Sequence, residues 1–242
     1  NDSSPELLET QVASFRKYLM EDFEFIVVNS ESMSEQPTKA KEITRISCEL
    51  SVKTLEVIKD EEIVNLWQGT VNQGEKLLDR DGRYVRGKGG DACNYMLQWL
   101  WNKVVCLEQG PICIVHSDLF LVAPVKLTDY LKDYHICSVL NSQPNTNHPD
   151  DGPLVFLWET LFLVKPSEIP NPETMVWFPS RVEGSWCDTG GPTHYYLKAH
   201  PDVRLLAIEA TFHFDDPNVD FHPSRYQFFY FDDKKVALHY QS

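Results

Sequence analysis

The segment Cys113–Pro124, CIVHSDLFLVAP, carries the most specific chemical signal in the chain. Side chains two residues apart in an extended chain point to the same side, so His116 and Asp118 can converge on one ligand. Hard divalent cations prefer carboxylate oxygens, and an imidazole is an acceptable ligand for Mn²⁺. A histidine and an aspartate at this spacing also recur by chance. The alternative interpretation is that Asp118 caps a turn and His116 is a hydrogen-bonded histidine of the core.

A second cluster, Trp186–Tyr196 with the sequence WCDTGGPTHYY, combines two glycines with a carboxylate. Gly190 and Gly191 allow a ligand to approach the backbone closely, and the amides of the helix predicted after them can face a phosphate or a sugar hydroxyl. Asp188 can act as a general base toward an acceptor hydroxyl, or it can hold a sugar hydroxyl in place. The alternative is a glycine turn that Asp188 merely caps.

Two weaker candidates lie outside these segments. Glu159 interrupts the apolar run Leu154–Val164, where an unpaired carboxylate is costly to bury. A sugar contact, an arginine partner or exposure to solvent would each explain this carboxylate. The basic side chains of Arg80–Asp91 can close over a diphosphate as a lid, and a solvated loop is the alternative.

The elements that position these residues alternate along the chain, as hydrophobic periodicity and helix-start signals indicate. In order, we expect a helix from Ser4, a strand over Phe23–Asn29, a helix over Lys39–Leu50, a strand over Val52–Ile58, a long connection over Lys59–Gly90, a helix over Asp91–Leu107 and a strand over Pro111–Val115. Such alternation is typical of a mostly parallel sheet. The polar residues that follow the last of these strands would then lie at its carboxyl end, where open α/β sheets bind ligands.

The last part of the chain predicts strands with tighter connections. We expect a short helix from Thr128, strands over His135–Leu140 and Leu154–Val164, a helix over Thr193–His200, and a hairpin of Tyr226–Phe231 with Lys235–Tyr240. The expected fold class is therefore α/β, with a mixed, mostly parallel central sheet flanked by helices and with antiparallel additions toward the C-terminus.

Composition limits the classes of partner. The 242 residues include 22 Lys and Arg against 36 Asp and Glu, a formal charge of −14, which disfavours binding to a nucleic acid polymer. The six cysteines show no metal-finger spacing, so we expect free buried thiols in a reducing compartment, the cytoplasm. No apolar run is long enough to cross a bilayer. One domain over residues 1–242 is expected, either complete or cut from a longer protein.

On these residues the chain resembles nucleotide-sugar glycosyltransferases with the GT-A fold, and is most similar to poorly characterised sugar transferase-like proteins of bacteria and large viruses. In that superfamily an apolar strand leads into an Asp-x-Asp motif and a Pro-containing apolar exit, as Ile114–Pro124 does here. The opening helix, with Gln11 and Phe15, and the closing Leu238–Tyr240 occur in the same order. The resemblance covers most of the chain and rests on order and spacing.

The resemblance implies a metal site. Asp118 matches the second Asp of the motif, which binds the divalent metal that bridges the donor diphosphate. His116 stands where the first Asp normally lies, and this departure puts metal dependence in doubt. His239 resembles a C-terminal histidine that completes the metal site in several members, and the alternative is an edge-strand histidine. The implied metal is Mn²⁺ or Mg²⁺, bound by Asp118, His239 and His116.

The resemblance and the position of the predicted elements also imply a donor site. Asn29 would contact the nucleotide base, and Asp91 and Asn94 would reach the ribose or the base. The full set of donor-binding candidates is Asn29, Asp91, Asn94, His116, Asp118, Gly190 and Gly191, with Asp188 as the catalytic residue.

The implied activity is transfer of a sugar from a UDP- or GDP-type nucleoside diphosphate donor to a hydroxyl of a saccharide, lipid or protein acceptor. A second hypothesis is a domain of similar shape that has lost catalysis and serves as a binding or scaffolding module, for which His116 in place of Asp is the support. A third is a nucleotidyltransferase or a sugar-nucleotide hydrolase.

Overall fold

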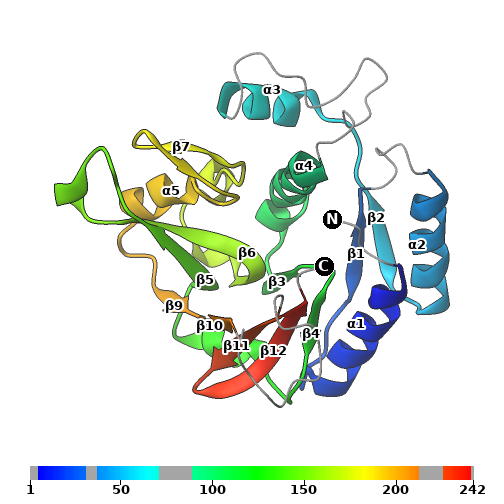
Figure 1. The fold of residues 1–242 in the computed structure, drawn as a ribbon. Helices are drawn as coiled ribbons and strands as arrows, with labels where there is room; N and C mark the ends of the chain where they lie inside the picture. The colour runs from blue at the N-terminus through cyan, green and yellow to red at the C-terminus, as the bar shows by residue number, and fades with distance from the viewer. Residues whose placement is uncertain (1–4, 31–36, 71–88, 213–225, 241–242) are drawn as a thin grey trace.

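The computed structural model describes residues 5–30, 37–70, 89–212 and 226–240 (Figure 1). The α-helices are α1 (Pro5–Tyr18), α2 (Pro37–Glu49), α3 (Glu61–Thr70), α4 (Gly89–Lys103) and α5 (Thr193–Ala199). The strands are β1 (Ile26–Asn29), β2 (Lys53–Glu56), β3 (Ile112–Val115), β4 (Leu119–Leu121), β5 (Ile136–Gln143), β6 (Leu154–Val164), β7 (Ser180–Val182), β8 (Ser185–Cys187), β9 (Leu205–Ala207), β10 (Glu209–Phe212), β11 (Tyr226–Phe231) and β12 (Lys234–Tyr240).

The sequence predicted most of these elements, and the differences lie in connections. The connection expected between Lys59 and Gly90 contains the helix α3, and the short helix expected from Thr128 is a 3₁₀ helix over Leu127–Lys132. Five short strands, β4 and β7 to β10, were not predicted. The C-terminal hairpin is confirmed, with Asp232 and Asp233 at its turn, both with positive φ.

The predicted mostly parallel central sheet is wrong. Within the described residues, β1 and β2 form a parallel pair joined through α2, while the two larger sheets have the strand orders β10-β11-β12-β4 and β3-β6-β5-β9. The first is antiparallel throughout, and in the second β6 runs antiparallel to both β3 and β5, with a parallel β9 at the edge. The apolar run of β6 reflects burial on both faces, and such a pattern does not specify the direction of the neighbouring strands.

As Ile208 does between β9 and β10, the short segment from His116 to Asp118 links the two four-stranded sheets. It leaves β3, which pairs with β6, and enters β4, which pairs with β12. In Figure 1, β4 and β12 lie below β3, and α1 lies beside β4. Residues that connect two sheets are held from both sides, so this segment is positioned rigidly even though the predicted parallel topology is absent.

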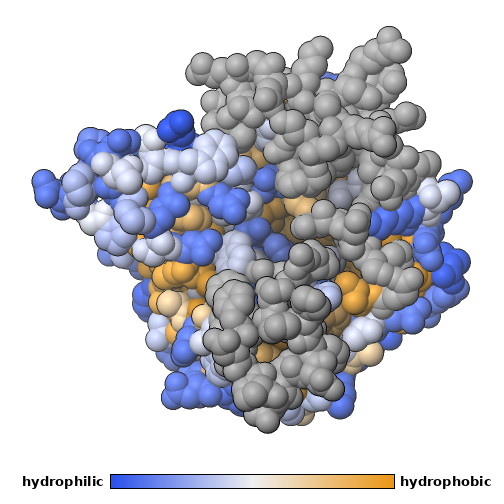
Figure 2. Space-filling model, in the orientation of Figure 1, coloured by the Kyte–Doolittle hydropathy of each residue, from blue (hydrophilic) through white to orange (hydrophobic). Residues whose placement is uncertain are grey.

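A hydrophobic cluster packs α1 against this junction. It joins Phe15 of α1 to Leu119 of β4, Leu161 of β6, Phe229 of β11 and Ala237 of β12, all buried. Figure 2 shows hydrophobic residues across the middle of one face and hydrophilic residues over its left and right ends. The packing of α1 therefore supports the segment that carries the candidate ligands.

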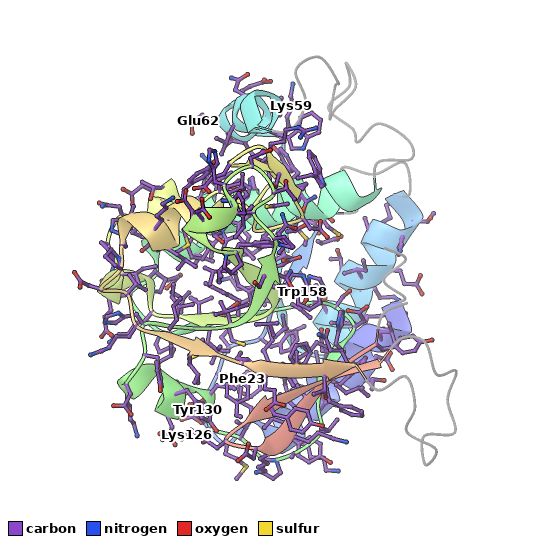
Figure 3. The ribbon with its side chains drawn as sticks, turned by 60° about the vertical axis from the view of Figure 1, so that its left-hand side comes forward. Phe23, Lys59, Glu62, Lys126, Tyr130 and Trp158 are labelled. Carbon is purple, nitrogen blue, oxygen red and sulfur yellow. The ribbon has the colours of Figure 1, made fainter. Side chains whose placement is uncertain are left out.

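Asp60 anchors the helix α3, which lies away from this junction. Figure 3 shows Glu62, in the first turn of α3, at the top of the molecule, and Trp158 of β6 in its middle. The Oδ1 of Asp60 accepts hydrogen bonds from the amides of Glu62 (2.9 Å) and Ile63 (3.3 Å), and Oδ2 lies 2.8 Å from Lys103 Nζ. Burial alone raises the pKa of Asp60, but the hydrogen bonds from Lys103 and the two amides outweigh it and hold that pKa below 3.8.

We therefore expect Asp60→Asn to lower the free energy of unfolding by about 1 kcal/mol or less at neutral pH, because asparagine keeps the cap but loses the charge, and solvent screens the partly exposed Lys103. The folded-state pKa is the lower one, so this contribution is complete above the unfolded pKa and is lost as pH falls through the folded value. Urea unfolding of the parent and of Asp60→Asn between about pH 7 and about pH 3 measures this difference in the free energy of unfolding. A difference that grew on acidification would contradict the assignment.

None of the six cysteines forms a disulfide, as expected, but only Cys137 and Cys187 are buried, so the prediction of buried thiols holds for two of them. None of the helices in the described part of the chain has the length and apolar character needed to cross a membrane.

Candidate metal site

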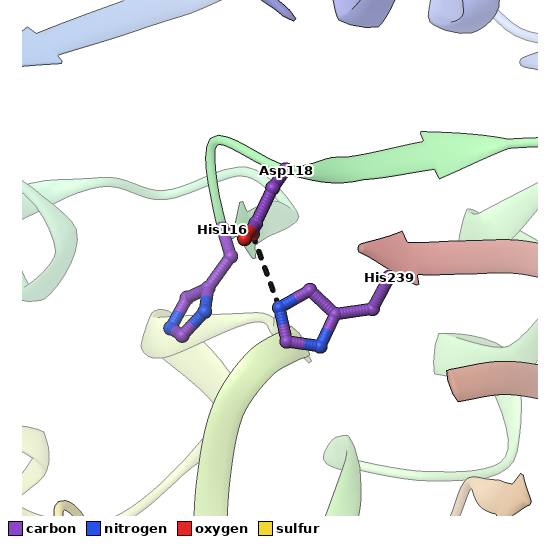
Figure 4. Close-up of side chains that lie close together, drawn as sticks. All are labelled: His116, Asp118 and His239. Atoms are coloured by element: carbon purple, nitrogen blue, oxygen red, sulfur yellow. Dashed lines mark ion pairs between the residues drawn. The ribbon is translucent and has the colours of Figure 1, made fainter. Parts of the chain in front are cut away.

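A tight turn after β3 presents His116 and Asp118. The Leu119 amide donates to His116 O at 3.1 Å, and the His116 amide donates to Thr160 O of β6 at 3.1 Å. On the other side, the Tyr240 amide donates to Asp118 O at 2.9 Å. Because His239 pairs with Leu119 in the β12–β4 register, its imidazole is brought beside this turn (Figure 4).

The buried side chain of Gln11 holds the turn from α1. Its Nε2 donates to His116 O at 2.6 Å and to Leu119 O at 2.9 Å, so one amide group fixes both ends of the turn. One helical turn farther along, Ser14 Oγ accepts a hydrogen bond from the Leu121 amide at 3.2 Å. These bonds add side-chain partners to the backbone of the turn and of β4, and they make α1 the support of the turn.

The ligand atoms of His116, Asp118 and His239 all lie within 4.8 Å of one another. Asp118 Oδ1 and His239 Nε2 are 3.0 Å apart, yet this buried Oδ1 has no hydrogen-bond partner among the described residues. Ligands bound to a metal at about 2.1 Å and at right angles to each other are about 3.0 Å apart. The pair thus has the spacing of two neighbouring ligands of one ion, as well as that of an ion pair, and an ion would give Asp118 Oδ1 a further partner.

The three side chains differ in exposure, which indicates where a ligand would enter. Side-chain exposure is 30% for His116, 15% for Asp118 and 5% for His239. The imidazole of His239 lies against the ring of Phe229, with centroids 6.3 Å apart, and its Nδ1 is 3.5 Å from Gln227 Oε1. An ion here would therefore be fixed on its buried side by His239 and open to solvent on the His116 side.

Two pKa shifts follow from this geometry. Burial alone raises the pKa of Asp118, but the neighbouring His239 and the charge of His116 outweigh it, so this pKa lies below 3.8. Burial alone lowers the pKa of His116, but its hydrogen bond to Glu159 and the charges of Glu159 and Asp118 outweigh it, so this pKa lies above 6.5. Asp118 is therefore ionised at neutral pH, the form that binds a cation.

The glycine cluster has a structural explanation in its contact with β6. A Cβ on Gly190, whose φ is +81°, would lie 2.1 Å from Leu157 O, and a Cβ on Gly191 would lie 2.4 Å from the Cβ of Cys187. Thr193 Oγ1 accepts from the Leu157 amide at 2.9 Å and donates to Gly190 O at 2.6 Å. The close backbone approach expected here is thus to a strand of the same chain.

The structure brings the cluster and Asn94 together. Thr189 Oγ1 donates to the buried Asn94 Oδ1 at 2.7 Å, while Asp188 is exposed and its Oδ1 accepts from the Thr189 amide at 2.8 Å. The hydrogen bond of Thr189 leads to α4 and that of Asp188 stays within the cluster, so neither of the two leads to the turn of His116 and Asp118. Asp188 therefore remains a predicted base with an accessible carboxylate.

The other predicted donor contacts lie elsewhere in the fold. Asn29, at the end of β1, is buried, and its Nδ2 donates to Ala40 O at 3.2 Å and Glu56 Oε1 at 3.0 Å, so its amide ties β1 to α2 and β2. Asp91 belongs to α4, and its side chain is not among those described. Residues 80–88 of the predicted lid are outside the described residues.

Comparison with known proteins adds no assignment to this geometry. No protein-family model, no curated protein and no solved structure matches the chain.

Proposed function

We propose that the protein is a metal-dependent transferase that binds the diphosphate of a nucleotide sugar at His116, Asp118 and His239 and moves the sugar to an acceptor hydroxyl. The observation that carries the proposal is the convergence of three ligand atoms at Asp118, whose buried Oδ1 lies 3.0 Å from His239 Nε2. The resemblance of Ile114–Pro124 to an Asp-x-Asp segment, with His116 in place of the first Asp, supports a diphosphate as the partner of the ion. The proposed activity needs the three ligand side chains and the turn that holds them, and it does not need a parallel GT-A sheet.

The residues have separate tasks in this proposal. Asp118 supplies the anionic ligand, and His239, the least exposed of the three, anchors the ion on the buried side. A bound divalent ion would offset the negative charge that grows on a departing diphosphate. Gln11 keeps the turn in the binding conformation, and Asp188, with an exposed carboxylate, is the proposed general base for the acceptor hydroxyl.

The donor set bears on the identity of the ion. Two imidazoles and one carboxylate suit first-row transition metals better than Mg²⁺, which prefers oxygen ligands and keeps several waters. We therefore propose Mn²⁺ ahead of Mg²⁺.

A thermal-shift panel of UDP- and GDP-sugars, each with and without Mn²⁺, tests the proposal. A ligand at 100 times its dissociation constant adds about 2.7 kcal/mol of stability, so the correct donor should raise the melting temperature only when Mn²⁺ is present, and chelation should abolish the rise. Labelled donor then separates transfer to an acceptor from hydrolysis, and binding without either reaction indicates a scaffold. A panel without any metal-dependent shift would contradict the proposal.

A second candidate follows from the same donor set. Two histidines and one carboxylate with open positions also form the facial triad of mononuclear non-haem iron(II) oxygenases. Dioxygen consumption by the Fe²⁺-loaded protein, absent from Asp118→Asn, would favour that activity over sugar transfer.

A further inference from the structure

Glu159 is a buried carboxylate in the apolar strand β6, next to the candidate metal site. Its Oε1 lies 3.3 Å from His116 Nε2, within hydrogen-bond distance, and its Oε2 has no hydrogen-bond partner among the described residues. The partner of Oε1 is therefore His116 and not an arginine, which was one of the partners that the sequence left open.

A break in strand pairing brings Glu159 to this position. Ser138 of β5 pairs with Phe162, but the next residue, Val139, pairs with Trp158, so β6 has three extra residues here, 159–161. Ser138 Oγ donates to Trp158 O at 3.0 Å and holds one end of the irregularity. Such irregularities redirect side chains and are common beside functional sites. The extra residues turn Glu159 toward His116, on the side of β6 that pairs with β3.

We propose that Glu159 is a positioning residue that accepts the Nε2–H of His116 and thereby keeps Nδ1 of that ring free for the ion. In Figure 4, one ring nitrogen of His116 is turned toward Asp118 and His239 and the other is turned away. Histidine ligands commonly donate their second N–H to a carboxylate, which fixes the tautomer and the ring orientation and raises ligand basicity. This inference rests on the metal site of the proposed function, but it does not depend on the donor.

A merely structural role makes a different prediction. A buried carboxylate with an unpartnered oxygen is costly to desolvate, so Glu159 is a poor source of stability. Replacing it by the uncharged glutamine should therefore leave the unfolding midpoint unchanged or higher while weakening metal binding. If Glu159 served only as a structural ion-pair partner of His116, Glu159→Gln would instead lower the unfolding midpoint and leave metal affinity unchanged.

The test is a titration with Co²⁺ alone, followed by its absorption spectrum, on the parent, Glu159→Gln, Glu159→Ala, His116→Ala and the double variant. Glu209→Ala, which removes an exposed carboxylate on β10, is the matched control. We expect Glu159→Ala to weaken Co²⁺ binding about 10- to 100-fold and to change the spectrum. Glu159→Gln keeps an acceptor oxygen and should lose less, and Glu159→Ala should have no further effect once His116 is absent.

Unchanged Co²⁺ affinity in Glu159→Ala, or an equal loss in the His116→Ala background, would overturn the inference and leave the transferase proposal standing. A parent that binds no Co²⁺ would overturn both. A parent that binds Co²⁺ with the expected Glu159 effects but binds no nucleotide sugar would support the inference while contradicting the transferase.

Discussion

Asp118→Asn should lose Mn²⁺ binding by more than about 100-fold, because loss of an outer carboxylate around a metal site already costs about 10- to 100-fold and Asp118 is the anionic ligand itself. Asparagine has nearly the same size and keeps an oxygen, so the turn held by Gln11 should persist. The metal-dependent thermal shift with a nucleotide sugar should disappear as well. Isothermal titration with Mn²⁺ measures the first effect.

Asp129→Asn is the control for this experiment. Asp129 is an exposed carboxylate on the 3₁₀ helix Leu127–Lys132, and its Oδ1 lies 2.6 Å from Lys132 Nζ. The substitution therefore removes the same kind of charge as Asp118→Asn, but outside the candidate metal site. We expect Asp129→Asn to bind Mn²⁺ as the parent does. Equal affinities of the parent and Asp118→Asn would show that Mn²⁺ binds elsewhere.

Gly190→Ala should lower the free energy of unfolding by about 3 kcal/mol or more. Two costs add: the positive φ of +81°, and a Cβ 2.1 Å from Leu157 O, a backbone atom that cannot move without disturbing β6. Urea unfolding followed by circular dichroism measures the change.

Gly152 offers a matched control, because it has the same φ of +81° but no heavy atom within 4 Å of the position of a Cβ. Gly152→Ala should therefore cost only the backbone strain, about 1 kcal/mol. If the two substitutions lowered the free energy of unfolding equally, the contact with Leu157 would not explain why residue 190 is glycine. A ligand-binding role for Gly190 would then regain support.

The sequence predicted local structure better than topology. The helix α1, the strand β6 and the C-terminal hairpin follow from periodicity and turn residues, which depend on neighbours along the chain. The parallel sheet was wrong because the alternation of helices and strands continues to β3, but β3 does not join β1 and β2; it pairs antiparallel with β6 in another sheet. The direction in which β6 runs relative to β3 is set by long-range pairing that its apolar pattern does not encode.

The candidate site was predictable in part for the same reason. His116 and Asp118 are two residues apart, so their convergence followed from local geometry, whereas His239 joins them through the pairing of β12 with β4 and was suggested only by resemblance. The contact between Glu159 and His116 depends on the pairing break in β6, and the support from Gln11 depends on how α1 packs. Neither contact can be predicted from the spacing of residues in the sequence.

Pulsed electron paramagnetic resonance of Mn²⁺ bound to the protein with a nucleoside diphosphate sugar tests the central claim most directly. We predict couplings to directly bound histidine nitrogen and to the phosphorus of the diphosphate in the same spectrum, both of which disappear in Asp118→Asn. Nitrogen without phosphorus would place a metal at His116, Asp118 and His239 but contradict its role in binding the donor. A spectrum of fully hydrated Mn²⁺ would contradict the site itself.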